Sequence, residues 1–318
     1  MILAAVLAAI VGVTALVVSL TDDGDSSTPD DGNAGSIVDI SGNEECYIPK
    51  APTADGQQME LLAPADTELT PAEVYQKMSA STVTVLATDD RGNTSMGTGV
   101  LLTADGYIVT NANCSSTGIV VPLRALNDAF GLNEVFVSTY QAISGAGYPG
   151  VPSLDIVGNV IPFISHEEEK METELAKMLG TYADGEFKYA GFKVMANCAR
   201  VPVIDGHTES LVIDMKESPS IDEVAKVLAD FRGEPQKLGL PSAPEQPIIV
   251  RAEENRPQPI YDVFAGTPDR ARGMASSVGR IRCSNGYYKM WVVSHNTLRG
   301  GAGGSMLNAE YAYKKGIL

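Results

Sequence analysis

The sequence is poor in the residues that metal sites and nucleic-acid-binding surfaces need. Its four cysteines, at positions 46, 114, 198 and 283, form no Cys-x-x-Cys pair, so we expect no zinc site and no disulfide framework. Lysine and arginine number 23 against 40 acidic residues, for a formal net charge of −17. That balance excludes nucleic acid as a partner, because phosphate groups bind basic side chains. One or more reactive thiols is the better interpretation of the cysteines, with the others structural.

The first 20 residues carry no charged side chain. About 20 apolar residues suffice to cross a bilayer, so we expect a transmembrane helix over residues 1–20. A signal peptide would begin with a basic stretch, which is missing, and this favours an uncleaved anchor. A misassigned start or an appended segment is the alternative.

Residues 21–69 have the composition of a disordered linker. Between residues 21 and 68 there are twelve acidic side chains and one lysine, with Gly, Ser and Pro throughout, and such a segment cannot bury enough apolar surface to fold alone. A capping box at residues 70–73 predicts a short helix that ends near residue 78. Short strands are expected next, at 82–87, 99–102 and 107–110.

After Cys114 helical and strand patterns alternate, which predicts an α+β domain with a mixed sheet. Ser220 and Glu223 form a second capping box, so a helix should begin there. The full set of expected elements is helices at 120–130, 167–179, 220–231 and 305–314, and strands at 135–140, 210–215, 248–250, 277–281 and 289–294.

The stretch 70–112 resembles the start of an HtrA-type (DegP-like) serine protease. The resemblance is carried by residues 68–75, by Gly-Thr-Gly-Val at 97–100 and by Asp-Gly-Tyr-Ile-Val-Thr-Asn-Ala at 105–112. In that family a histidine follows and acts as the general base, whereas this chain has Asn113. An amide cannot take a proton from serine, and the Gly-Asn-Ser-Gly-Gly nucleophile motif is also missing. We therefore predict no protease activity.

A second resemblance begins where the first ends. The blocks GYIVTNANCSSTGIVVPLRAL, STYQAISGAGYPGVPSLDIVGNVIPFI, RVPVIDGHTES, LGLPSAPEQPIIV and HNTLRGGAGGSMLNAE follow one another from residue 106 to residue 310. They resemble, in order, the catalytic and dimerisation domain of the aspartate-semialdehyde dehydrogenases, in their fungal and archaeal style. The chain is therefore interpreted as a fusion (a chimera) with its seam near residues 106–113 and the dehydrogenase-like domain at 113–318.

That resemblance implies an activity and its partners. In this family a cysteine thiolate attacks β-aspartyl phosphate, and NADPH reduces the resulting thioester to aspartate 4-semialdehyde. Phosphate is released, and the product feeds lysine, methionine and threonine biosynthesis. The resemblance also implies a homodimer in the cytoplasm, whereas the apolar N-terminus predicts a membrane anchor. The sequence leaves this conflict of localisation open.

The resemblance assigns the catalytic residues. Cys114 maps onto the nucleophile, and the Ser-Ser-Thr that follows it places it at a helix N-terminus, which favours the thiolate. His207 maps onto the acid and base, and imidazole titrates near neutrality. Gln141 matches the residue that orients the bound intermediate. Arg200 matches the residue that grips the substrate carboxylate, for which a planar guanidinium is suited.

Further residues match binding positions. Glu167 corresponds to a substrate-binding glutamate and Lys170 to a phosphate-contacting lysine, although this acidic stretch is also what an ordinary solvated helix end looks like. Ser144, Gly145 and Asn296 lie in loops that contact the nicotinamide end of NADP in this family.

The dinucleotide-binding part of the family has no counterpart before Cys114. Members begin with a Rossmann domain, and residues 70–112 are too short to form one, so we expect NADP to bind weakly. Two alternatives to an active dehydrogenase therefore stay open. One is a non-catalytic, membrane-tethered dimerisation module. The other is residual thioesterase-like chemistry at Cys114 and His207 without hydride transfer.

Overall fold

The structure is a computed structural model that describes residues 2–8, 14–20, 82–88, 94–101, 108–147, 149–183 and 186–316. The chain divides into two compact units, Met1–Leu101 and Leu102–Leu318. The predicted linker at 21–69 and the predicted helix at 70–78 lie outside the described residues.

The first unit is built from strands. β1 (Ile2–Ala8) and β2 (Thr14–Leu20) are antiparallel, which corrects the prediction of a single helix over residues 1–20. An uninterrupted apolar run fits a buried strand as well as a helix, because neither shows a polar face that would reveal the period. In the described parts of the chain we find no helix long and apolar enough to span a bilayer.

A hairpin completes this unit. β3 (Thr82–Thr88) pairs antiparallel with β4 (Thr94–Leu101), and β2 runs parallel to β3 at Val17 and Thr84. The strands predicted at 82–87 and 99–102 are therefore confirmed as strands, and the second begins five residues earlier than predicted.

The second unit contains a six-stranded mixed sheet, in agreement with the predicted α+β class. Its order is β11-β12-β13-β10-β6-β9. The pairs β6/β9 and β11/β12 are parallel, and the other neighbours are antiparallel. The strands are β6 (Leu132–Gln141), β9 (Lys193–Arg200), β10 (His207–Met215), β11 (Ile248–Arg251), β12 (Ser276–Ser284) and β13 (Tyr287–Ser294).

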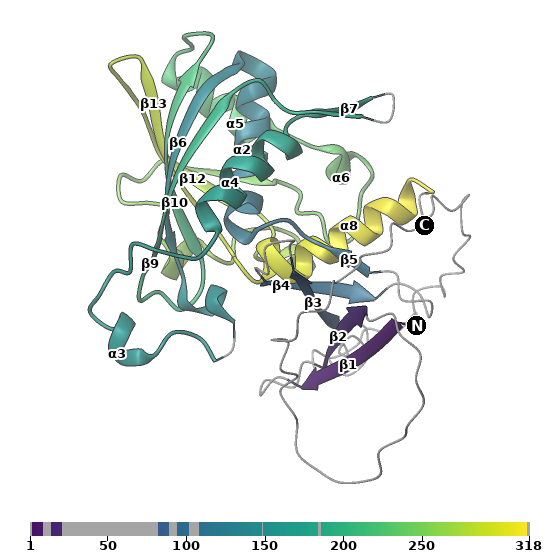
Figure 1. Ribbon diagram of the computed structural model, residues 1–318. Coiled ribbons are helices and arrows are strands. Elements are labelled where there is room, and N and C mark those ends of the chain that lie inside the picture. The colour runs from purple at the N-terminus through teal and green to yellow at the C-terminus, as the bar shows by residue number, and fades with distance from the viewer. Residues whose placement is uncertain are drawn as a thin grey trace, which may run out of the picture. The chain divides into compact units, whose positions relative to one another are not determined.

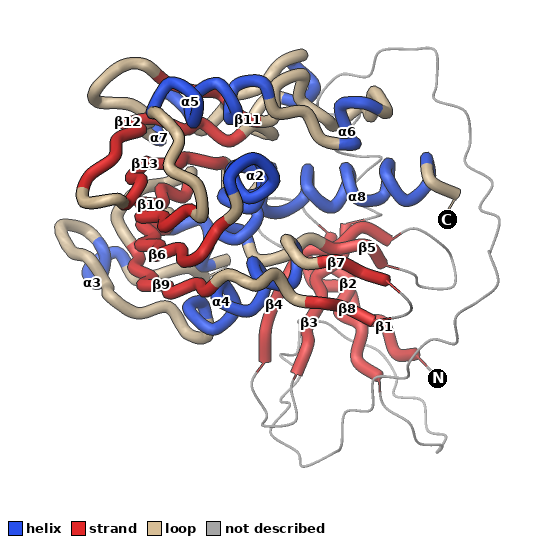
Figure 2. The backbone as a smooth tube through the Cα atoms, turned by 90° about the horizontal axis from the view of Figure 1, so that it is seen from above, coloured by secondary structure: helices blue, strands red, loops and turns tan. Residues whose placement is uncertain are grey.

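Three helices cover one face of this sheet (Figure 1). α2 (Cys114–Phe130) lies at the centre, with α4 (Glu167–Met178) on one side and α5 (Ile221–Asp230) on the other (Figure 2). In strand β10 every second residue from His207 to Met215 is buried. Since side chains alternate along a strand, this buried row is the one that faces the helices. The core between sheet and helices includes Ile119, Leu123, Leu126, Val135, Leu175, Leu211, Ile213, Leu228, Met290 and Val292.

The chain ends in α8 (Gly303–Lys314). This helix packs beside β5 (Ile108–Thr110), where Asn308 donates from Nδ2 to the Thr110 carbonyl at 3.1 Å. A small second core joins Leu307 to the loop between α5 and β11. The remaining short elements are η1 (Ile143–Ala146), α3 (Ser153–Ile156), β7 (Thr181–Ala183), β8 (Glu186–Lys188), α6 (Glu234–Lys237), α7 (Pro259–Asp262), η2 (Asp269–Ala271) and η3 (Leu298–Ala302).

Candidate active site

Cys114 is the first residue of the central helix, as the sequence predicts. Asn113 caps the helix, and its Oδ1 accepts the backbone N–H groups of Ser115 and Ser116 at 3.0 and 3.1 Å. Asparagine is among the residues best suited to this position. The side chain that replaces the expected protease histidine thus has a structural task at the start of α2.

The sulfur of Cys114 lies 3.1 Å from Nε2 of His207. His207 opens strand β10 and is completely buried. On the other side of its ring, Nδ1 accepts the backbone N–H of Ala142 at 3.1 Å. The pair therefore consists of a half-buried thiol and an imidazole that is bonded through both nitrogens.

The sheet register brings three predicted residues to one place. Gln141 ends β6 and pairs with Arg200 at the end of β9. Strands β6 and β10 are antiparallel, and Tyr140 is opposite Thr208. Gln141, the last residue of β6, and His207, the first residue of β10, therefore lie at the same end of the sheet. Since side chains alternate along a strand, all three face the N-terminus of α2. Cys114 and His207, which meet there, are 93 residues apart in the sequence.

Arg200 is almost entirely buried beside the dyad. Its Nη1 donates to the carbonyl oxygen of Ala142 at 2.8 Å, and burial lowers the pKa of its guanidinium. The backbone of Ala142 thus contacts both His207 and Arg200. Sequence reasoning gave no reason to single out Ala142, because its contribution comes from the backbone.

Glu167 lies inside the site but is held by protein partners. Both of its carboxylate oxygens accept from Nδ2 of Asn113, at 2.9 and 2.8 Å. One also accepts from Nε2 of Gln141, at 3.0 Å. Glu167 therefore links the cap of α2 to Gln141, while its contact with substrate stays a prediction. Lys170 follows one turn later on α4 and is half-buried.

The residues predicted to contact the cofactor lie beside the dyad. Asn296 donates from Nδ2 to Oγ of Ser144 at 2.8 Å and accepts the N–H of Gly206 at 2.9 Å. A Cβ atom on Gly145 would lie 2.8 Å from Cε1 of His207. A Cβ atom on Gly300, in the loop that follows Asn296, would lie 2.6 Å from Cβ of Cys114. At Gly145 and Gly300, therefore, only backbone atoms approach His207 and Cys114.

Burial sets the protonation of the dyad. It raises the pKa of the Cys114 thiol to about 12, and the charges of Glu167 and Glu209 act in the same direction. It also lowers the pKa of His207 to about 3, assisted by Arg200 and His295. The thiol and the imidazole are therefore both neutral near pH 7. The backbone N–H of Ser115, at the start of α2, lowers the pKa of the thiol, but desolvation has the larger effect. That the helix end favours the thiolate stays a prediction.

Glu209 is a site residue that sequence reasoning missed. It lies two residues beyond His207 on the same face of β10, opposite Thr139 of β6, and is completely buried. Burial raises the pKa of its carboxyl well above the usual value. Within the described residues neither carboxyl oxygen has a hydrogen-bond partner. The alternation of β10 could have revealed it, since the first and third residues of His-Thr-Glu share a face.

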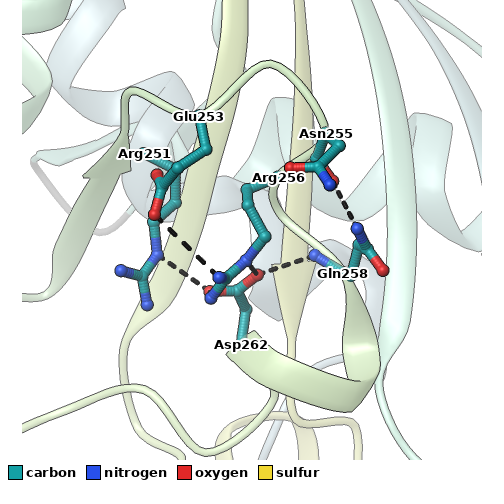
Figure 3. A network of polar contacts seen from close by, with 6 residues as sticks. All are labelled: Arg251, Glu253, Asn255, Arg256, Gln258 and Asp262. Atoms are coloured by element: carbon teal, nitrogen blue, oxygen red, sulfur yellow. Dashed lines mark hydrogen bonds and ion pairs between the residues drawn. The ribbon is translucent and has the colours of Figure 1, made fainter.

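An ion cluster surrounds the buried Asp262 of α7 (Figure 3), and α7 lies beside the turn before His207. Asp262 is fully buried in α7 and accepts from Nε and Nη2 of Arg256 at 2.7 and 2.5 Å. Arg251 reaches the same carboxylate at 2.8 Å. α7 packs on Gly206, whose φ of +95° and close neighbour Val263 leave no room for a side chain. The cluster therefore steadies the backbone that presents His207.

Comparisons of the sequence and of the structure with known proteins indicate the same family. The model of the semialdehyde dehydrogenase dimerisation domain matches residues 123–299. The aspartate-semialdehyde dehydrogenase of Methanothermobacter thermautotrophicus is 51% identical over 209 residues, which cover 65% of this chain and 59% of that protein. The Schizosaccharomyces pombe enzyme is 48% identical over 221 residues, covering 67% and 60%.

Solved structures agree with this result. The Candida albicans aspartate-semialdehyde dehydrogenase with NADP superposes with a TM-score of 0.58 at 42% identity, over 65% of this chain and 57% of that one. This chain thus spans about three-fifths of the length of the curated relatives it matches.

Proposed function

This chain belongs to the semialdehyde dehydrogenase family, whose dimerisation domain it contains, and on that premise we propose that it is an aspartate-semialdehyde dehydrogenase. The observation that carries the proposal is the 3.1 Å contact between Cys114 Sγ and His207 Nε2, at the point where Gln141 and Arg200 also end their strands. A thiol beside an imidazole, next to a buried guanidinium, suits acyl transfer from a substrate that carries a carboxylate.

The substrate proposed is β-aspartyl phosphate. The sulfur of Cys114 bonds to the acyl carbon, the bond from that carbon to the phosphate oxygen breaks, and hydrogen phosphate leaves with the thiol proton. Arg200 pairs with the α-carboxylate, and Gln141, fixed by Glu167, orients the thioester. A hydride supplied to the thioester carbon would release aspartate 4-semialdehyde and leave the sulfur of Cys114 as a thiolate. Lys170 contacts the phosphate, and the role of His207 as acid and base stays a prediction.

NADP is the proposed cofactor, and when bound as NADPH it supplies the hydride. The site fits its nicotinamide end. Gly145 and Gly300 leave the approach to His207 and Cys114 free of side chains, and the joined pair Ser144 and Asn296 offers a hydroxyl and an amide. The family resemblance assigns the remaining cofactor contacts to a Rossmann domain.

A second copy of this chain is the proposed protein partner. The sheet face away from α2 carries a stacked pair of rings, Tyr140 and Trp291, with centroids 5.6 Å apart, and Met195 of β9 is exposed on it. An apolar sheet face of this kind suits a symmetric dimer interface. Replacing Trp291 by Arg should shift the mass measured by sedimentation from dimer to monomer. Tyr189→Arg, at an exposed loop site, serves as the control.

The activity is tested by the reverse reaction. The full chain, aspartate semialdehyde, phosphate and NADP⁺ should produce NADPH, and omission of phosphate or the change Cys114→Ala should abolish it. Dimers with no NADPH formation would support a non-catalytic dimerisation module instead. Release of free aspartate from β-aspartyl phosphate in water, without NADPH formation, would support thioesterase-like chemistry.

A further inference from the structure

The backbone of Ala142 decides which nitrogen of His207 carries the proton. An amide N–H can only donate, and the Ala142 N–H points at Nδ1 of His207 at 3.1 Å. Nδ1 must therefore present its lone pair. In a neutral imidazole the proton then resides on Nε2, the nitrogen that faces Cys114 Sγ.

The Ala142 amide has little freedom to turn away. Its side chain is completely buried, and its carbonyl oxygen accepts Nη1 of Arg200. The next residue, Ile143, donates its own N–H to the Val203 carbonyl at 2.8 Å. Bonds on both sides thus fix the orientation of the donor that faces His207.

The charged groups around the ring also oppose a second proton. Arg200 on β9 is a neighbouring cation, and His295, just after β13, adds no negative charge. Burial raises the pKa of Glu209 on the same strand, which disfavours its anion, and Cys114 on α2 is a neutral thiol. The carboxylate of Glu167 on α4 is engaged by Asn113 and Gln141.

We propose that the Ala142 amide holds His207 as the neutral Nε2–H tautomer, so that His207 donates a hydrogen bond to the sulfur of Cys114 before substrate binds. Protonating Nδ1 would set two donors against each other and leave the buried Ala142 N–H without an acceptor. Ala142 is a positioning residue in this account. The consequence for turnover rests on the proposed function: the thiol proton leaves on the phosphate, and Nε2–H stabilises the sulfur anion when the aldehyde departs.

The tautomer can be observed directly, whether or not the chain turns over. The full chain has three histidines, so ¹⁵N-histidine labelling with His207→Gln gives the assignment. Between pH 5 and pH 8 the Nδ1 resonance of His207 should stay at the position of an unprotonated nitrogen while Nε2 carries hydrogen. A protonated Nδ1, or a ring that titrates near pH 6.5, would overturn the proposal.

An amide-to-ester replacement tests the cause. Placing the ester at residue 142 removes the N–H and keeps the side chain, so His207 should gain the Nδ1–H tautomer and bind a second proton at higher pH. An ester at Ile143 removes a neighbouring backbone bond that does not touch His207, and it should leave the resonances in place. Equal shifts in both esters, or none at 142, would contradict the role of Ala142.

Discussion

A Cβ atom on residue 300 would lie 2.6 Å from the Cβ of Cys114 and 2.8 Å from its Cα. Real Cβ contacts essentially never come so near, and the atoms in the way belong to the backbone and the first side-chain carbon of the nucleophile. Only glycine at position 300 lets the loop after β13 close over the start of α2.

Gly300→Ala should therefore move Cys114 away from His207 and lower kcat by about 100-fold, the cost expected of a displacement of about 1 Å at a reacting group. The control is Gly191→Ala, because a Cβ there meets open space. Steady-state kinetics with aspartate semialdehyde measures both. Unchanged kcat in Gly300→Ala would show that the close approach does not position the nucleophile.

Glu167→Gln should lower kcat without a large change in KM. The new amide would place a donor against Asn113 and Gln141, which both donate to the carboxylate now. The cap of α2 should weaken and Gln141 should lose its fixed orientation, which should lower kcat by roughly 10-fold to 100-fold. A rise in KM for the semialdehyde with kcat preserved would instead identify Glu167 as a substrate contact.

Asp262→Asn should destabilise the fold strongly. The change removes the buried carboxylate that holds Arg256 and Arg251 (Figure 3), and breaking a buried ion pair on one side costs about 3–5 kcal/mol. Glu253→Gln is the matched control, since Glu253 is half exposed and 3.9 Å from Arg256, and it should cost less than about 1 kcal/mol. Urea unfolding measures the free energy of unfolding of both variants. Equal losses in the two would contradict a special contribution of the buried Asp262.

The depressed pKa of His207 predicts a particular acid sensitivity. Its pKa falls from 6.5 to about 3 in the folded chain, so its contribution to stability is complete above pH 6.5 and is lost as the pH falls toward 3. The slope is at most about 1.4 kcal/mol per pH unit. His207→Asn keeps an acceptor for Ala142 but cannot titrate, so its stability curve should be flatter in this window.

The comparison isolates His207, because the buried acid Glu209 titrates in both proteins. The exposed His166 has positive φ, which asparagine tolerates, so His166→Asn is a fair control and should leave the curve unchanged. Parallel curves for the wild type and His207→Asn would contradict the neutral imidazole.

Local sequence signals predicted parts of the fold well. Ser220 and Glu223 form the expected capping box, and α5 begins directly after Ser220. By contrast, the apolar period predicted a helix only from residue 120, and α2 begins six residues earlier, at Cys114. Its first turn buries Ser115, Ser116 and Thr117, so polar residues hide the apolar period there.

Other features depend on tertiary context. β9 was not predicted, because its polar residues at 193, 197 and 200 conceal the pattern of an edge strand. The pairing of Gln141 with Arg200 follows from sheet order, which no local pattern fixes. The hydrogen bond from Ala142 to His207 has a backbone donor, so the residue type at position 142 does not predict it.

The most direct test of the central claim is acylation of Cys114. The full chain is incubated with β-aspartyl phosphate in the absence of any nicotinamide cofactor, and its peptides are analysed by mass spectrometry. The account predicts an aspartyl group on Cys114, released by hydroxylamine and missing in Cys114→Ala, together with one phosphate released per acyl group. An unmodified Cys114, or acylation confined to the exposed Cys283, would contradict it.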